Sequence, residues 1–206
     1  MQYEYSLIHI SDDFGRGGDM YSLSLVDAHD LAFSCNGKSV ILSGKYLFCF
    51  SSSDKAEHIT GDYTAKTLYF LPYFYNVNLN TAIIDAPVYA EMREKFGYPD
   101  FYLFRKRTND YNGIIKLTDS EYESVFTLFS SAERHIESHP SDVMWSCRTR
   151  SEIISVLRIA EAAQKGKHTN VTNEVFVISA RTPKPICRCR RSVQNSAPTA
   201  RLLQTR

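Results

Sequence analysis

A chain of 206 residues, 43% of them hydrophobic, can hold one domain with a packed core and an appendage, which excludes a wholly disordered protein. The net charge of +1 hides an asymmetry, because the residues from Lys165 onward carry nine Lys and Arg against one acidic residue, Glu174. Residues 1–164 keep 15 of the 24 basic and 22 of the 23 acidic residues, a net charge of −7. This acidic part should repel nucleic acid, so only the basic end is suited to contact it.

Cysteine usage and the N-terminus indicate a reducing, cytoplasmic setting. The five cysteines are odd in number and mostly isolated, which argues against a disulfide framework: Cys35, Cys49, Cys147, Cys187 and Cys189. The first residues, "MQYEYSLIHISDD", alternate and carry acidic groups, unlike a secretion signal. No apolar run approaches the length of a membrane span, so no membrane partner is expected.

The first 70 residues predict short β-strands. Residues 2–10 alternate with period two, and further strands are expected in "YSLSLVD", "DLAFSCNG", "SVILSG", "KYLFCFSS" and "AKTLYFLP". Turn signals separate them: Asn36-Gly37, Ser43-Gly44, the cluster 51–54 and Gly61-Asp62. Asn36-Gly37 fits a type I′ hairpin turn. Repeated short strands of this kind favour an antiparallel barrel or sandwich.

Helical patterns follow. A short helix is expected within 85–97, and a longer one over 119–138, where Thr118 and Glu121 fit a capping box and Pro140 follows the end. A second long helix should run from about Arg148 to Gln164, with Gly166 as its stop signal. The two long helices would form a hairpin.

The predicted organisation is therefore mostly β with α, in three parts. Residues 1–112 would form a barrel with a peripheral short helix, and 113–165 a helical hairpin. Residues 166–206 are basic, contain Cys187-x-Cys189 and lose their apolar period after Arg181. They predict a disordered basic tail.

Metal chemistry finds little support, because His9, His29 and His58 are scattered along the predicted strands and Cys187-x-Cys189 lacks a partner pair. Neither a metal nor another cofactor is therefore expected. The chain is expected not to be an enzyme.

Cys147 is the one candidate nucleophile, since Arg148 and Arg150 follow it at the start of a predicted helix. No motif supplies the base that a catalytic cysteine needs, so a packing role is favoured and no catalytic residue is assigned.

A ligand pocket inside the barrel and a fully packed core are both compatible with the aromatic strands. The inward positions are Phe33, Phe48, Phe50 and Tyr69, and His29 and His58 are polar candidates near strand ends. These six are the candidate ligand-binding residues.

Two stretches carry a family resemblance. "TLYFLPYFYN" holds Pro72 and Asn76 after an aromatic strand, and "WSCRTRS" holds Trp145, Cys147, Arg148 and Arg150 at the start of the second helix. With their order along the chain, residues 1 to about 165 resemble the N-terminal half of AraC-type transcriptional regulators. Leu71 stands where many relatives have His, and Ser146 where Pro is frequent.

The resemblance implies a cupin-like effector-binding barrel, a dimerising hairpin and a following helix-turn-helix DNA-binding domain. It implies a homodimer through the hairpin, with Tyr122, Val125, Phe129, Ile153 and Leu157 as dimerisation residues, and a sugar or other metabolite as effector. Residues 166–206 are too few for the DNA-binding domain, which predicts that a frameshift or early terminus replaced it. DNA contact would then need the missing domain or a full-length partner.

The "WSCRTRS" stretch is interpreted as the elbow of the hairpin. Trp145 would anchor the turn against the barrel, and Asp142 would pair with Arg148 or Arg150. Two alternatives to the regulator remain: a cupin-like barrel enzyme, such as an isomerase or dioxygenase, and an inactive fragment.

Overall fold

The computed structural model describes residues 7–15, 18–76, 79, 84, 86, 88, 101–105, 111–139 and 141–181, without the side chains of 102, 105 and 167–181. The chain divides into two units, residues 1–169 and 170–206. Most of the helix predicted within 85–97, and the predicted tail beyond Arg181, lie outside the described residues.

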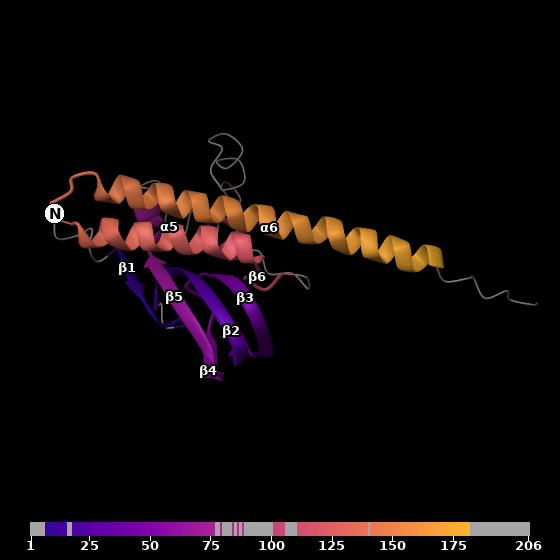
Figure 1. The fold of residues 1–206 in the computed structure, drawn as a ribbon. Coiled ribbons are helices and arrows are strands. Elements are labelled where there is room, and N and C mark those ends of the chain that lie inside the picture. Colours follow the sequence, from indigo (N-terminus) through magenta and orange to yellow (C-terminus); the bar gives the residue numbers. More distant parts are fainter. Residues whose placement is uncertain are drawn as a thin grey trace, which may run out of the picture. The chain divides into compact units, whose positions relative to one another are not determined.

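Six strands form one antiparallel sheet (Figure 1). They are β1 (Ile8–Ser11), β2 (Tyr21–Cys35), β3 (Lys38–Phe50), β4 (Ala56–Thr60), β5 (Tyr63–Phe70) and β6 (Ile114–Lys116). The order is β1-β5-β2-β3-β6, and β4 pairs with β2 beyond the end of β5. The predicted mixture of antiparallel sheet and helices is confirmed. Among the described strands nothing joins β1 to β6, so the predicted closed barrel is not seen.

β2 is a single bent strand, where the sequence predicted two. Its pairing with β3 shifts between Ala28 and Leu31, so that two residues of β2 oppose one residue of β3. The amides of His29 and Asp30 donate to the Asp62 carbonyl at 2.9 and 3.3 Å, and the Asp62 amide donates to the Asp30 carboxylate. The bulge is thus held by hydrogen bonds to the joint between β4 and β5.

The neighbouring strands bend at the same level. Gly44, opposite Ala28, has φ +108° and continues β3, so the turn predicted at Ser43-Gly44 is wrong. Gly61 has φ +98° and joins β4 to β5, which run in the same direction along β2. The hairpin predicted at Asn36-Gly37 is confirmed, with φ of 50° and 76° at its two residues.

The bend curls the sheet back over itself. β3 ends at Phe50 beside the start of β2, and β4 begins at Ala56 beside the end of β2. Only five residues join them, and an extended chain covers at most about 3.5 Å per residue, so the two ends of β2 must come close. Asp54 ties the connection by accepting from the Ser51 amide (2.8 Å) and the Asn36 side chain (2.8 Å).

The helices cover the opposite face of the sheet. Figure 1 shows α5 (Asp119–Glu137) packed across the sheet at an angle to the strands. The part of α6 (Trp145–Arg181) within the first unit lies antiparallel beside α5. Two short helices, α1 (Pro72–Tyr75) and α4 (Tyr102–Arg105), complete the described elements. Leu23, Leu25 and Leu47 of the sheet share one core with the apolar faces of α5 and α6. Burial of this core is the main contribution that holds the hairpin on the sheet.

The helix ends match the sequence signals only in part. The capping box at Thr118 and Glu121 is present, with both reciprocal hydrogen bonds formed. α6 continues to Arg181, so the predicted end near Gln164 is wrong. A glycine inside a helix costs about 1 kcal/mol relative to alanine, which is too little to force an end at Gly166.

The candidate ligand-binding face and its link to the hairpin

The sheet face turned away from the helices, here named the inner face, is lined mainly by aromatic side chains. Phe14, in the β1–β2 loop, meets Phe33, Phe48 and Tyr63 edge to face, with ring centres 5.5, 5.1 and 5.4 Å apart. The bulge in β2 shifts the alternation by one residue. Val26 and Ala28 before it, and Leu31 and Phe33 after it, therefore all point inward.

Four of the six predicted ligand residues lie on the inner face. Phe33, Phe48 and Phe50 belong to the buried cluster there. Tyr69 lies opposite Ser22 on β2, and Thr67 lies opposite Ser24. Ser22 and Ser24 share the face of Val26, because residues two apart in a strand point to the same side, so Tyr69 points to the inner face as well. The structure does not bring His29 and His58 to this face. His29 is an exposed residue of the bulge, and His58 is exposed with φ 55°.

Two hydroxyl groups are buried on the inner face without a hydrogen-bond partner among the described residues. They belong to Ser24 and Thr67, which oppose each other on β2 and β5 and are fully buried. Burying an unpaired hydroxyl costs about 1–3 kcal/mol by protein mutational data. Such groups stand ready to bind a polar ligand or a water molecule.

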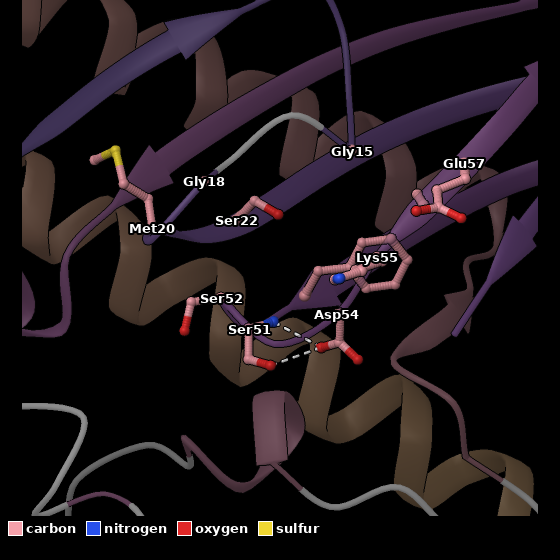
Figure 2. A pocket seen from close by; sticks show the side chains of 11 residues that line it. Gly15, Gly18, Met20, Ser22, Ser51, Ser52, Asp54, Lys55 and Glu57 are labelled. Carbon is pink, nitrogen blue, oxygen red and sulfur yellow. Dashed lines mark hydrogen bonds between the residues drawn. The ribbon is translucent and has the colours of Figure 1, made fainter. Parts of the chain in front are cut away.

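A cavity of about 250 Å³ opens where the curled sheet meets itself. Its lining includes Ser22 and Phe50 from one end of β2 and β3, Ala56 and Glu57 from β4, and Asp54. Figure 2 shows the Ser22 hydroxyl directed into this space, opposite the 51–57 segment. Hydroxyl, carboxylate and aromatic groups therefore share one cavity at the mouth of the inner face.

Ser22, Ser24 and Thr67 were not among the residues predicted for this site. In "YSLSLV" the serines alternate with leucines, which predicts that Ser22 and Ser24 share one face. Because serine is common on exposed faces, this signal alone does not indicate burial.

Tyr69 connects the inner face to the loop beside the cavity. Its hydroxyl donates to the Asp13 carbonyl at 3.3 Å, and its ring stacks on His9 with centres 5.0 Å apart. Gly15, two residues beyond Asp13, lines the cavity. Movement of this loop would therefore displace Tyr69 and, with it, strand β5.

The two sequence stretches that carry the family resemblance contact each other. The Phe74 ring of α1 packs on the Trp145 ring of α6, with centres 5.8 Å apart. The Arg150 Nε donates to the Phe74 carbonyl at 2.6 Å, and its guanidinium lies 5.2 Å from the Phe74 ring centre. This contact of Phe74, Trp145 and Arg150, here named the joint, ties the end of the sheet to the start of α6.

The remaining residues of these two stretches have local positions. Pro72 begins α1, and the Asn76 amide donates to its carbonyl at 3.1 Å. Arg148 pairs with Asp142 at 2.9 Å, which confirms one of the two predicted pairings. Cys147 is exposed, so the packing role favoured for its side chain is wrong. The predicted anchoring role of Trp145 is consistent with its 3% exposure and its contact with Phe74.

Most of the predicted dimerisation residues belong to the core of the chain itself. Val125, Phe129, Ile153 and Leu157 are at most 1% exposed, and Tyr122 is partly buried against the same core. The four buried side chains hold the hairpin on the sheet and are not exposed on the surface of the described chain. Among the side chains that the structure describes between 119 and 166, the large exposed apolar ones are Phe126 on α5 and Val143 and Met144 at the tip of the hairpin.

Within the part of the chain that the structure describes, no three metal-binding side chains gather into a cluster. No described helix is both long enough and apolar enough to cross a membrane. No protein-family model and no curated protein matches this chain.

Proposed function

We propose that this chain is the ligand-sensing and dimerisation module of an AraC-type transcriptional regulator acting in the cytoplasm. The observation that carries the proposal is the pair of unpartnered hydroxyls of Ser24 and Thr67, which are buried on the inner face with its mainly aromatic side chains. A site of mostly aromatic groups with a few convergent polar groups is typical of small-molecule binding.

The effector is a small polar metabolite, such as a sugar. A cavity of about 250 Å³ is near the lower limit of small-molecule pockets, which favours a ligand of about one ring. The Phe50 ring suits the apolar side of such a ligand, and the Ser22 hydroxyl and the Asp54 carboxylate that line the cavity suit its polar edge. An effector that binds one arrangement of the dimer better than another would shift the equilibrium between them.

Dimerisation would use the outer surface of the hairpin. The predicted dimerisation residues pack on the sheet, and among the side chains described in 119–166 Phe126, Val143 and Met144 are exposed apolar groups for a second copy. Contact with DNA would come from a domain beyond the described residues or from a partner.

A thermal-shift screen with sugars and other small metabolites, combined with sedimentation of the purified chain, tests the proposal. We expect at least one compound to raise the melting temperature and the chain to sediment as a dimer. The effect should weaken in Thr67→Val, which removes the inner hydroxyl, and persist in Thr127→Val on the exposed side of α5. The absence of any stabilising compound, together with a monomer, would overturn the proposal.

A further inference from the structure

We propose that Arg150 is the positioning residue through which occupancy of the inner face acts on the helical hairpin. This regulation rests on the sensing function proposed above. It requires a physical link from the inner face to the end of the sheet, and another from there to α6.

The first link is strand β5. Thr67 and Tyr69 point to the inner face from β5, which ends at Phe70. α1 begins only two residues later, at Pro72, whose ring fixes the backbone φ. The Leu71 amide between them donates to the Leu7 carbonyl at 2.9 Å, so the connection is held on both sides. A shift of Tyr69 is therefore passed to α1 through a short and stiff stretch.

The second link is the bond from Arg150 to Phe74, 76 positions apart in the sequence. The four-residue helix α1 cannot supply intrahelical donors to its last carbonyls, so the Phe74 carbonyl takes its donor from α6. The planar guanidinium also lies over the Phe74 ring, and lysine cannot reproduce both contacts. A displacement of Phe74 would therefore displace the Arg150 guanidinium and change the packing of the Trp145 ring.

The hairpin side of the joint is rigid enough to transmit this movement. The Trp145 ring contacts Phe74 on one side. On another side it contacts His139, at the start of the α5–α6 turn, with ring centres 5.0 Å apart. The Thr149 hydroxyl donates to the Trp145 carbonyl at 2.9 Å inside the first turn of α6. Displacement of the joint would thus reorient the start of α6 relative to α5.

Trp145 is the single tryptophan of the chain, so its fluorescence reports directly on the joint. The test is a double-mutant cycle in the full chain, without ligand. Tyr69→Phe removes the hydrogen bond to Asp13 on the inner face, and Arg150→Met removes the bond to Phe74. Arg148→Met is the matched control, because it removes an equal charge on the same helix but only the exposed pair with Asp142.

We expect Tyr69→Phe to change acrylamide quenching of Trp145 and amide exchange in residues 151–160 by about twofold or more, as for coupled residues. The same change should persist in R148M and disappear in R150M. If R150M does not fold, R150K serves instead, since it keeps the charge but lacks the Nε donor and the planar group.

Equal effects of Tyr69→Phe with and without Arg150 would overturn the proposal, and so would an unchanged Trp145 signal in Y69F alone. A merely structural role of Arg150 would change stability but leave the two effects additive. Because the cycle contains no ligand, its failure leaves the sensing function standing. A failed ligand screen, in turn, leaves the cycle interpretable.

Discussion

The ammonium group of Lys45, on β3, lies 4.7 Å from the centre of the Tyr122 ring on α5. The same nitrogen is 3.1 Å from a carboxylate oxygen of Asp119. A cation, a ring and an anion thus join the sheet to the first turn of the hairpin. The hydrogen bond to Asp119 raises the pKa of Lys45 above its ordinary 10.5, against the opposing effect of burial. Burial, followed by the charge of Asp27, raises the pKa of Tyr122 above its ordinary 10.0.

These two shifts predict weaker folding at alkaline pH. Both groups have higher pKa values in the folded chain than in the unfolded chain. Their stabilisation is therefore complete below about pH 10 and is lost as the pH rises through the folded values. Thermal denaturation between pH 7 and 11 should show a decline above pH 10 that is shallower in Lys45→Met and Tyr122→Phe. A decline in both variants that is as steep as in the parent chain would contradict the assignment of this effect to Lys45 and Tyr122.

Removing the ring at the joint should destabilise the chain strongly. Phe74 is 1% exposed, and replacing a buried phenylalanine by alanine typically costs about 3–5 kcal/mol, so Phe74→Ala should fall in this range. Tyr73→Ala is the control in the same helix, because Tyr73 is 51% exposed, and its effect should stay within about 0.5 kcal/mol. Urea denaturation followed by Trp145 fluorescence measures both. Similar losses in the two variants would show that the packing against Trp145 contributes little.

Alanine at two glycines should act in opposite directions. At Gly61, with φ +98°, an added Cβ would lie 2.2 Å from the Asp30 carbonyl oxygen, so Gly61→Ala should cost more than about 1 kcal/mol. At Gly166, inside α6, the added Cβ meets nothing within 4 Å. Gly166→Ala should therefore stabilise the chain by up to about 1 kcal/mol. Thermal melts of both variants, followed by circular dichroism, give the sign of each change. A G61A variant as stable as the parent chain would contradict the close approach of Gly61 to the Asp30 carbonyl.

Removing a buried unpaired hydroxyl should stabilise the chain without ligand. Thr67→Val keeps the shape of the side chain and should gain about 1 kcal/mol, because valine carries no hydroxyl to be desolvated. Chemical denaturation of T67V beside the parent chain measures the gain. A loss of stability instead would show that the Thr67 hydroxyl has a partner in the folded chain.

The local signals in the sequence predicted much of the secondary structure. Asn36-Gly37 and the Thr118–Glu121 box act over a few residues, so both were recognisable and both are present. The bend at Ser43-Gly44 was mistaken for a turn because a glycine with positive φ suits either. The pairing of β2 and β3 on both sides of it decides between them. The three-residue strand β6 is too short to show a period.

The alternation of side chains along the strands predicted only part of the site. Alternation placed Phe33, Phe48, Phe50 and Tyr69 on one face. His29 and His58 were chosen for their chemistry, without regard to the side of the strand on which they lie. The apolar stripe of α5 and α6 identifies a buried face, but it cannot show whether the sheet or a second chain buries it.

The bulge at His29 and Asp30 makes the far half of β2 sensitive to a change in chain length at this point. Deleting one of these residues would restore regular pairing and rotate Leu31, Phe33 and Cys35 to the other side of the strand. Three core side chains would then face solvent, although every one of them would still be present in the sequence. Related sequences should accordingly keep two residues between Ala28 and Leu31, and should vary in residue type more at the exposed His29 than at Asp30, whose carboxylate accepts from the Asp62 amide.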